Sequence, residues 1–473
     1  MQPEKQPGKQ PGKKPCHPYL CAMAAAALAA MAISIWCGMA EAQQSAAASM
    51  PRRCSYDIHL QDRAALVLNV SVTCNAGPRV EFDRPGGGGE IAALADYEEG
   101  DDGLSLRYRF RLGDLAALAN SPDIAQRVGA AVISPLSIWL ADPQIPDAEI
   151  ALRVTADPGL GFALCPPEED GVRRLRGEDL RFGGYAVFGQ FDRRLLSIGD
   201  AAIELITFPG RLVLPGPVLE RWITDSATAV SQYFGGFPLQ RTLLVAVPVA
   251  GHSGVIFGRV RGGGGGTILL RLGELVSKAE LHEDWMLVHE MVHLGAPFVT
   301  GRASWLMEGM ATYAEPIIRE RAGWHTPAQL WQEFASQMRH GLPALTSESL
   351  NAVSSRGIYW GGALFMLLAD LDIREHSDGE ASLETCFRAI LKAGGDTTVR
   401  WPRRRVLAAC DAATGTGTMA RLEDRYVSEA GPLDLDALWK DLGVTLDGGK
   451  VVFDETAPRA ALRRAITRGA AGD

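Results

Sequence analysis

Two histidines and a glutamate at residues 289–293, HEMVH, have the residue types and the spacing of a zinc centre. Residues four apart in an α-helix lie one turn apart on the same face, so the imidazoles of His289 and His293 can bind one cation. Glu290 lies beside them, where its carboxylate can take a proton from a water molecule that zinc activates. The pattern therefore predicts a hydrolytic zinc site with Glu290 as the general base.

A catalytic zinc site needs a third protein ligand and an open position for water. A third histidine six residues after the second is excluded, because Val299 stands there. The next candidate is Glu308, on a second predicted helix that begins near Ser304. Glu315 lies on the same predicted face of that helix, where we expect it to hydrogen-bond a histidine ligand. We therefore predict one Zn²⁺ per chain, with the two histidines and Glu308 as its ligands.

The residues that follow HEMVH extend the pattern beyond the ligands. WLMEGMATY at 305–313 completes a motif, H-E-x-x-H followed by W-L-x-E-G-x-A-x-Y, that resembles the gluzincin metallopeptidases. The similarity is to the glycyl aminopeptidase family and, more distantly, to the aminopeptidase N family. RGIYWGGALFMLLADLDIR at 356–374 resembles the start of their Y-x-K-G-A helix, and SQYFGGFPLQRTLLVAVPV at 231–249 resembles their strand-entry segment. The resemblance covers roughly residues 217–393.

The resemblance implies a role for each residue of the motif. The families' zinc ligands fall on the two histidines and Glu308, and their general base falls on Glu290. Their oxyanion-binding tyrosine falls on Tyr359, a neutral donor that would stabilise negative charge on the tetrahedral intermediate. Gly361 stands where the families have a lysine. The interval between the second histidine and Glu308 is shorter than theirs, so the loop at 295–303 must be tight.

One feature of these families is missing. Their aminopeptidases bind the free amine of the substrate with a glutamate in G-G-L-E-H or G-A-M-E-N, whereas the matching stretch here, GRVRGGGGGTILL at 258–270, contains no acidic residue. Burying an ammonium group without a carboxylate costs on the order of several kcal/mol. We therefore expect weak or no strict aminopeptidase activity, unless Glu280 or Glu283 substitutes, and acceptance of internal bonds or blocked N-termini. Glycines loosen the cleft wall there and make room for substrate. The glycines expected to bind substrate are Gly264, Gly265 and Gly266.

The predicted elements give an α+β, multidomain fold class. Short alternating apolar runs predict an all-β N-terminal domain at 43–212, a sandwich or open barrel with one helical interruption near 115–133. Helical periodicity mixed with buried strands, together with the resemblance, predicts a thermolysin-like zinc catalytic domain at 213–345. A mostly helical C-terminal region follows at 346–473, with a short strand at 450–454.

The N-terminus carries a predicted export signal. Four lysines precede an apolar run at 19–39, and the A-x-A site at 40–42 follows it, so residues 1–42 have the pattern of a secretory signal peptide. The run is also just long enough to span a bilayer, which leaves an uncleaved anchor open. We expect an exported protein, periplasmic or extracellular, that contacts a membrane only if this segment stays attached.

Five cysteines follow that segment, and in an oxidising compartment they can pair. Cys54 and Cys74 flank two alternating runs around a polar turn, so a hairpin there would place them opposite each other. Cys386 and Cys410 are the next pair in order of plausibility, which would leave Cys165 free. Five buried thiols remain the alternative.

Composition limits the class of partner. The charged and apolar fractions are ordinary for a soluble globular protein, and the net charge of −9 argues against nucleic acid. The expected partner is a peptide or protein substrate, and the expected function is that of an exported zinc metallopeptidase. A zinc hydrolase of non-peptide amides or esters, and a binding protein that keeps the fold without turnover, are the alternatives. The intact Glu290 and Tyr359 count against the binding protein.

Overall fold

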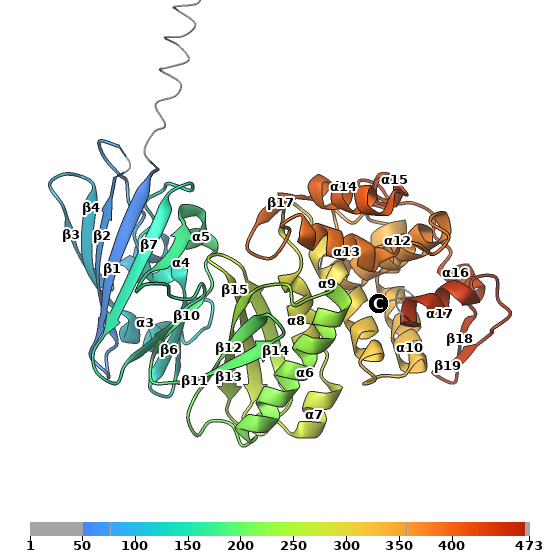
Figure 1. Cartoon of the computed structure of the whole chain (residues 1–473), viewed down its shortest axis with the longest axis horizontal. Helices are drawn as coiled ribbons and strands as arrows, with labels where there is room; N and C mark the ends of the chain where they lie inside the picture. The colour runs from blue at the N-terminus through green and yellow to red at the C-terminus, as the bar shows by residue number, and fades with distance from the viewer. Residues whose placement is uncertain (1–50, 76, 355–356, 469–473) are drawn as a thin grey trace, which may run out of the picture. The chain divides into compact units, whose positions relative to one another are not determined.

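The described part of the chain begins with two β-sheets (Figure 1). The computed structural model describes residues 51–75, 77–354 and 357–468, so the predicted signal peptide lies outside the described residues. The first sheet has, in spatial order, β3 (Ala95–Glu99), β4 (Ser105–Arg111), β2 (Val67–Cys74), β1 (Arg53–Gln61), β7 (Glu149–Ala156) and β9 (Arg173–Arg176). The second has β5 (Gln126–Val128), β6 (Ala131–Pro135), β10 (Tyr185–Gly189) and β8 (Gly161–Ala163).

Strand β1 shows why these residues form a sheet. Its side chains alternate between buried and more exposed positions, because successive residues of a strand face opposite sides. The buried set, with Tyr56, Ile58 and Leu60, packs in one core with Trp139 and Phe188. Short helices complete this region. They are η1 (Pro85–Gly87), α2 (Gly89–Ala92), α3 (Leu112–Ala119), α4 (Leu136–Trp139) and α5 (Gly177–Phe182). The predicted sheet-rich N-terminal part is confirmed.

The helix predicted near residues 115–133 is wrong over most of its length. α3 ends at Ala119 because Asn120 adopts the left-handed conformation (φ 40°) that stops a helix. β5 and β6 then form an antiparallel hairpin, and Gly129 (φ 62°) provides the positive φ at its turn. Because of these two turn residues, the helix ends early and a pair of strands forms where its second half was expected.

The third sheet positions the histidine-bearing helix. Its strands are, in spatial order, β11 (Asp192–Ile198), β12 (Ala201–Thr207), β13 (Arg241–Val249), β15 (Gly266–Gly273) and β14 (Val255–Arg261). β12, β13 and β15 run parallel, and β14 is antiparallel to β15 at the edge of the sheet. β11 and β12 belong to this sheet although they precede residue 212, and we call the residues up to the end of β10 the first region.

Both faces of the third sheet are buried at its central strand β13. Along β13, Leu244 and Ala246 pack in a core with the helices that follow in the chain. The alternate residues, Leu243 and Val245, pack in another core with side chains of the second sheet, including Tyr185. Such double burial explains the nearly continuous apolar sequence of β13. The described residues from Arg52 onward form one compact unit.

Helices dominate the remainder of the chain, which confirms the α+β fold class. They are α6 (Gly216–Phe234), α7 (Lys278–Glu283), α8 (Met286–Leu294), α9 (Ser304–Arg321), α10 (Pro327–Gln337), η2 (Met338–His340), α11 (Leu342–Thr346), η3 (Gly357–Gly361), α12 (Gly362–His376), α13 (Leu383–Lys392), α14 (Arg403–Thr414), α15 (Thr418–Tyr426), α16 (Leu435–Leu442) and α17 (Ala460–Arg468). Short strands pair within this part. They are β16 (Phe298–Thr300) with β17 (Arg400–Pro402), and β18 (Val444–Asp447) with β19 (Lys450–Phe453). Within the described ranges, no helix combines the length and the apolar character needed to cross a bilayer.

Helices α9 and α12 approach each other at a pair of glycines. A Cβ atom added to Gly309 would lie 2.5 Å from the backbone of Gly362, and one added to Gly362 would lie 2.7 Å from the Cα of Gly309. Only residues without a side chain fit at this crossing. The crossing fixes the position of α9, which carries Glu308.

The two predicted disulfides are confirmed. Cys54 and Cys74 are register partners of β1 and β2 and are joined by a disulfide, and Cys386 and Cys410 join α13 to α14. Cys165 is a buried free thiol, as expected.

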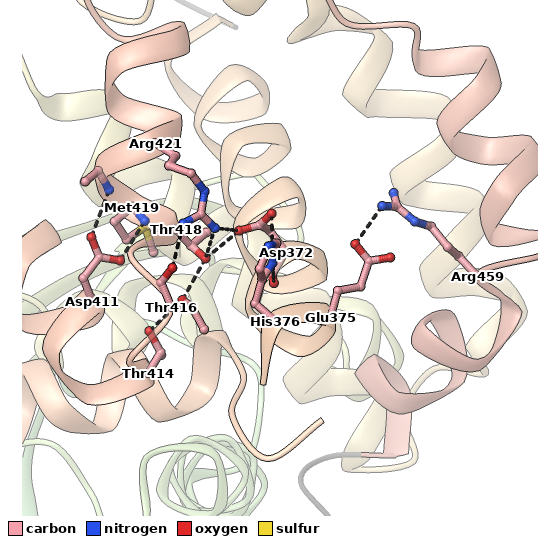
Figure 2. Close-up of polar contacts among 11 residues, drawn as sticks. Asp372, Glu375, His376, Asp411, Thr414, Thr416, Thr418, Met419, Arg421 and Arg459 are labelled. Carbon is pink, nitrogen blue, oxygen red and sulfur yellow. Dashed lines mark hydrogen bonds and ion pairs between the residues drawn. The ribbon is translucent and has the colours of Figure 1, made fainter. Parts of the chain in front are cut away.

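A chain of threonine hydroxyl groups links the C-terminal helices (Figure 2). The hydroxyl groups of Thr414, Thr416 and Thr418 form a hydrogen-bonded series, and Thr418 donates to the Asp372 carboxylate of α12 at 2.6 Å. Arg421 of α15 forms an ion pair with the same carboxylate. These contacts hold the turn between α14 and α15 against α12, which is the helix that supports α9.

Candidate zinc site

Helices α8 and α9 bring three ligand atoms together. His289 Nε2 lies 3.2 Å from Glu308 Oε2, and His293 Nε2 lies 3.4 Å from the same oxygen. All three atoms lie within 4.8 Å of one another. Two imidazole nitrogens and one carboxylate oxygen are the donor set of a catalytic zinc site. The residues therefore fit a zinc ion, and the structure brings together all three ligands predicted from the sequence.

The local sequence fixes helix α8 at both ends. At its start, the Asp284 carboxylate accepts a hydrogen bond from the backbone amide of Leu287 at 3.0 Å. At its end, Gly295 packs against the ring of Phe234 in α6, where no side chain would fit. Every residue of α8 from Leu287 onward is buried. The histidines are therefore presented from a rigid element that the core holds on all sides.

Electrostatics in the ligand set fit a cation. Burial alone would raise the pKa of the Glu308 carboxyl group, but hydrogen bonds to both histidines hold that pKa well below its usual range. Burial lowers the pKa of His289, whereas for His293 the contact with Glu308 outweighs burial and raises the pKa. The Nδ1 atoms of both histidines are buried without a hydrogen-bond partner among the described residues.

Glu290 is buried next to the edge strand β14. Burial raises the pKa of its carboxyl group to about 7, and the nearby charge of His293 opposes the rise. A Cβ atom on Gly258 would lie 2.6 Å from the Glu290 side chain, so the strand passes this carboxylate only because residue 258 is glycine. A carboxylate with a pKa near neutrality has the proton affinity of a general base.

Tyr359 lies near the ligand set, beside His289. It belongs to the π-helical turn η3 that leads into α12, and its side chain is 41% exposed. The centre of its ring lies 6.3 Å from that of His289. The phenol therefore reaches the same cavity as the zinc ligands.

The expected contact between Glu315 and a histidine ligand is wrong. The Glu315 carboxylate accepts a hydrogen bond from Arg319 at 3.0 Å, one turn further along α9, and both side chains are buried. Arg319 also donates to the backbone carbonyl of Glu283 at 3.0 Å. A helical pattern gives the face of a residue but not its partner, and here the arginine four residues away forms the ion pair.

The expected role of Gly264, Gly265 and Gly266 in substrate binding is also not supported. These glycines lie outside the cavity beside the zinc ligands. Added Cβ atoms on Gly264 and Gly265 would collide with Leu175 and Cys165 of the first region, and one on Gly266 would collide with Leu239. The glycines of this run that do line the cavity are Gly262 and Gly263.

We call the cavity beside the zinc ligands the zinc cleft; it has a volume of ≈ 580 Å³. The cleft is lined by four aromatic side chains, Phe182, Trp285, Phe298 and Tyr359. The first three are each 46% exposed, whereas large apolar side chains are usually buried. Arginines and β14 complete the wall. These lining residues are Arg181, Arg259, Arg261 and Arg400, with residues 257–263 of β14 and the turn after it.

Sequence reasoning missed most of this lining. Trp285 and Phe298 flank the HEMVH motif and can be suspected from that position. Phe182 ends α5 in the first region and Arg400 begins β17, so only the tertiary fold brings them to the cleft. Nothing in the sequence around either residue indicates that it lines the cleft.

Comparison with solved structures relates the fold to zinc metallopeptidases. The structure is similar to that of an aminopeptidase N family protein from Idiomarina loihiensis, with a TM-score of 0.61 and 14% identity, over 86% of this chain and 82% of that chain. It is also similar to an M1 zinc metallopeptidase from Deinococcus radiodurans, with a TM-score of 0.51 and 16% identity, over 81% of this chain and 96% of that one. A mutant M1 zinc metallopeptidase from the same organism, bound to a Tyr-Ser-Ala substrate, matches with a TM-score of 0.50 and 16% identity over the same shares of both chains.

No protein-family model matches the chain, and no curated protein matches it. At these identities the likeness is one of fold. It confirms, at that level, the expected resemblance to the aminopeptidase N family.

Proposed function

We propose that this protein is a zinc metallopeptidase that hydrolyses peptide bonds. The observation that carries the proposal is the convergence of the ligand atoms of His289, His293 and Glu308 beside the buried Glu290. Zinc, when bound, supplies a Lewis acid that activates water near neutral pH. Three protein ligands leave a position open for that water, which fits one catalytic ion per chain. The similar fold of M1 zinc metallopeptidases supports zinc as the metal.

Two side chains of the cleft are assigned chemical roles. Glu290 accepts a proton from the attacking water and passes it to the amine that leaves, which a carboxylate with a pKa of about 7 can do in both directions. Tyr359 donates its phenol proton in a hydrogen bond to the oxygen that becomes negatively charged. Both side chains line the zinc cleft.

The edge strand supports a peptide over a small ester or amide. Among the described strands β14 pairs only with β15, and its residues 257–261 line the cleft. An extended peptide can add to such an edge through main-chain hydrogen bonds. The bound Tyr-Ser-Ala in a structural neighbour supports the same class of substrate. We infer a thermolysin-like arrangement, in which the HEMVH helix lies against this strand.

Strict aminopeptidase activity is not favoured. Glu280 is held by Ser253 and Ser277, and neither it nor Glu283 lines the cleft. Of the carboxylates that do, Glu290 and Glu308 belong to the zinc site. Glu178 pairs with Arg176 at 2.9 Å, and Asp179 accepts the Arg176 backbone amide at 2.7 Å. No carboxylate of the described lining remains for a substrate ammonium, so blocked N-termini should be accepted.

The two disulfides support an oxidising compartment and therefore export. The predicted signal peptide at 1–42 is the segment that would direct it.

Purified full-length protein incubated with a peptide library, with and without a zinc chelator, tests the proposal. We expect cleavage that the chelator abolishes and added zinc restores. Glu290→Gln should keep its zinc and its thermal stability while turnover falls by several orders of magnitude, because proton transfer is lost. Cleavage that persists at native rates in Glu290→Gln, or after zinc removal, would refute the mechanism. Comparing free and N-acetylated forms of one good substrate then distinguishes strict aminopeptidase activity from cleavage of blocked peptides, since a strict aminopeptidase cleaves only the free form.

A further inference from the structure

An arginine without an acidic partner lies on the wall of the zinc cleft. The guanidinium carbon of Arg400 lies 3.7 Å from the ring centre of Phe182 and 4.7 Å from that of Phe298. Phe298 is the register partner of Arg400 in the β16–β17 pair, and Phe182 ends α5. Arg400 itself is exposed, and the described residues offer its guanidinium group neither an ion pair nor a hydrogen bond. We call these three residues the arginine clamp.

The other arginines of the cleft differ from Arg400 because each has a carboxylate partner. Arg259 and Arg261 both pair with Asp123, and Arg181 pairs with Asp142 at 2.7 Å. Their charges are therefore partly neutralised inside the protein. In a chain whose formal net charge is −9, a cation exposed in the cleft without a counter-ion is available to a ligand.

Stacking between two rings prepares the guanidinium for such a ligand. Arginine stacks on aromatic rings through its flat faces, and its N–H groups lie around the rim of the plane. A carboxylate binds at this rim through two parallel hydrogen bonds. The rings also restrict the side chain, so less conformational freedom is lost when the ligand binds.

The clamp has a defined place along the cleft. Gly262, which follows β14, packs against the carbonyl of Thr397 in the loop before β17. Gly263 forms a bridge with Gly183, next to Phe182. The clamp therefore lies beyond the end of β14, whereas Gly258 lies against Glu290. Gly262 lies four positions after Gly258 along the chain, which corresponds to about 13 Å of extended backbone.

We propose that the arginine clamp binds a carboxylate of the substrate, about four residues from the bond that is cleaved. This inference rests on the proposed peptidase function and names the class of peptide that the site selects. The carboxylate has two possible sources. A chain running antiparallel to β14 brings an acidic side chain on the N-terminal side of the scissile bond to the clamp. A chain running parallel brings an acidic side chain or the C-terminal carboxylate on the other side.

The test uses one neutral peptide substrate, N-acetylated and C-amidated, and a matched set of its variants. In each variant a single glutamine is replaced by glutamate, and one variant has a free C-terminal carboxylate. We expect glutamate at one position, or the free C-terminus, to raise kcat/KM by ~10-fold, mainly through KM, since a hydrogen-bonded ion pair contributes about that factor. The position that responds identifies the source of the carboxylate.

The preference is then measured in two variants. Arg400→Gln should reduce the acidic-to-neutral ratio of kcat/KM to about 1, because the clamp loses its charge. Arg405→Gln is the matched control: Arg405 stacks on Trp401 at 3.7 Å, but it does not line the cleft, and the ratio should stay at its native value. Equal rates for all peptides in the native protein, or a preference that survives in Arg400→Gln, would overturn the inference.

Binding separates this inference from the proposed function. Kd values of the acidic and neutral peptides are measured for Glu290→Gln, and for the same protein that also carries Arg400→Gln. If the native protein cleaves no peptide, the peptidase proposal fails, and tighter binding of acidic peptides that depends on Arg400 would still support the clamp. If acidic peptides bind no better than neutral ones, the clamp is wrong even where cleavage is observed.

Discussion

A single oxygen of the Glu308 carboxylate lies next to both histidines of the candidate zinc site. Glu308 Oε2 lies within 3.4 Å of each Nε2 atom, so this side chain alone closes the ligand triangle. Its side chain is only 24% exposed, and its carboxylate lies against the imidazoles of both histidines. The removal of Glu308 therefore leaves two ligands, too few for a stable catalytic zinc site.

Glu308→Ala should weaken zinc binding by more than the about 10–100-fold that the loss of an outer-shell partner causes. Competition with a chelator of known affinity measures the change. Glu315→Gln is the matched control on the same helix, because the Glu315 carboxylate binds Arg319 and no histidine. It should keep native zinc affinity while its thermal stability falls. Native zinc affinity in Glu308→Ala would exclude this residue as a ligand.

Tyr359→Phe removes one hydrogen-bond donor and little else. The side chain is partly exposed in the cleft, and no hydrogen bond to its hydroxyl group is recorded among the described residues, so the fold should be unchanged. We expect kcat to fall by about 10²–10³-fold with KM nearly constant, the loss typical of one oxyanion donor. Steady-state kinetics on one good peptide measures it, and an unchanged kcat would make the tyrosine structural.

At the residue scale, the sequence predicts the candidate zinc ligands better than it predicts the contacts of the residues around them. The three ligands and Glu290 follow from spacing along two helices, because a helix fixes which residues share a face. The predictions for Glu315 and for the glycines at 264–266 are wrong for a related reason. Arg319 pairs with Glu315, and neighbouring side chains crowd the glycines, and a pattern of spacing includes neither kind of contact.

At the scale of elements, the zinc site depends on how closely α9 approaches α12. Gly309 directly follows the ligand Glu308, and its backbone lies against Gly362. Gly309→Ala should therefore push the two helices apart and displace Glu308. We expect a loss of roughly 1–3 kcal/mol in the free energy of unfolding, the usual cost of overpacking, together with weaker zinc binding.

Gly216→Ala provides the control for that substitution. Gly216 begins α6, and an added Cβ would meet only the tip of Glu220 at 3.9 Å. Chemical denaturation and zinc competition on both variants measure the two effects. A Gly309→Ala protein with native stability and native zinc affinity would show that the crossing tolerates a methyl group.

Element boundaries followed from the sequence where local signals were strong. α9 begins at Ser304, as predicted from the sequence. The failure near 115–133 occurred where Asn120 and Gly129 adopt positive φ, a backbone choice that apolar periodicity does not report. The close contact of the glycine pair between α9 and α12 could likewise not be predicted. It depends on how the two helices cross, and not on the sequence around either glycine.

For the whole molecule, the important feature is the core shared by the second and third sheets. Ile133 and Tyr185 of the second sheet pack in one cluster with Val245 and Leu269 of the third. Neither region covers this apolar surface alone. The regions that the sequence presents as separate domains are therefore expected to unfold together.

Calorimetry on the full-length protein should show one cooperative unfolding transition, with equal calorimetric and van't Hoff enthalpies. Tyr185→Ala should lower the midpoint of that single transition and leave it undivided, because the cluster belongs to both regions. Two resolved transitions in the native protein would mean that the regions are thermodynamically independent.

The pairing of the cysteines also determines the order in which the chain can oxidise from its N-terminus. Cys54 meets its partner Cys74 before any other cysteine beyond the predicted signal peptide has emerged, and the next to appear, Cys165, is left alone until Cys386 follows. A wrong bond between those two is the main hazard of this order. N-terminal regions fold first during synthesis. Burial raises the pKa of the Cys165 thiol to about 12, so its reactive thiolate is scarce once that region has folded onto the third sheet. The Cys165 thiol is therefore buried and unreactive in thiol–disulfide exchange before Cys386 follows.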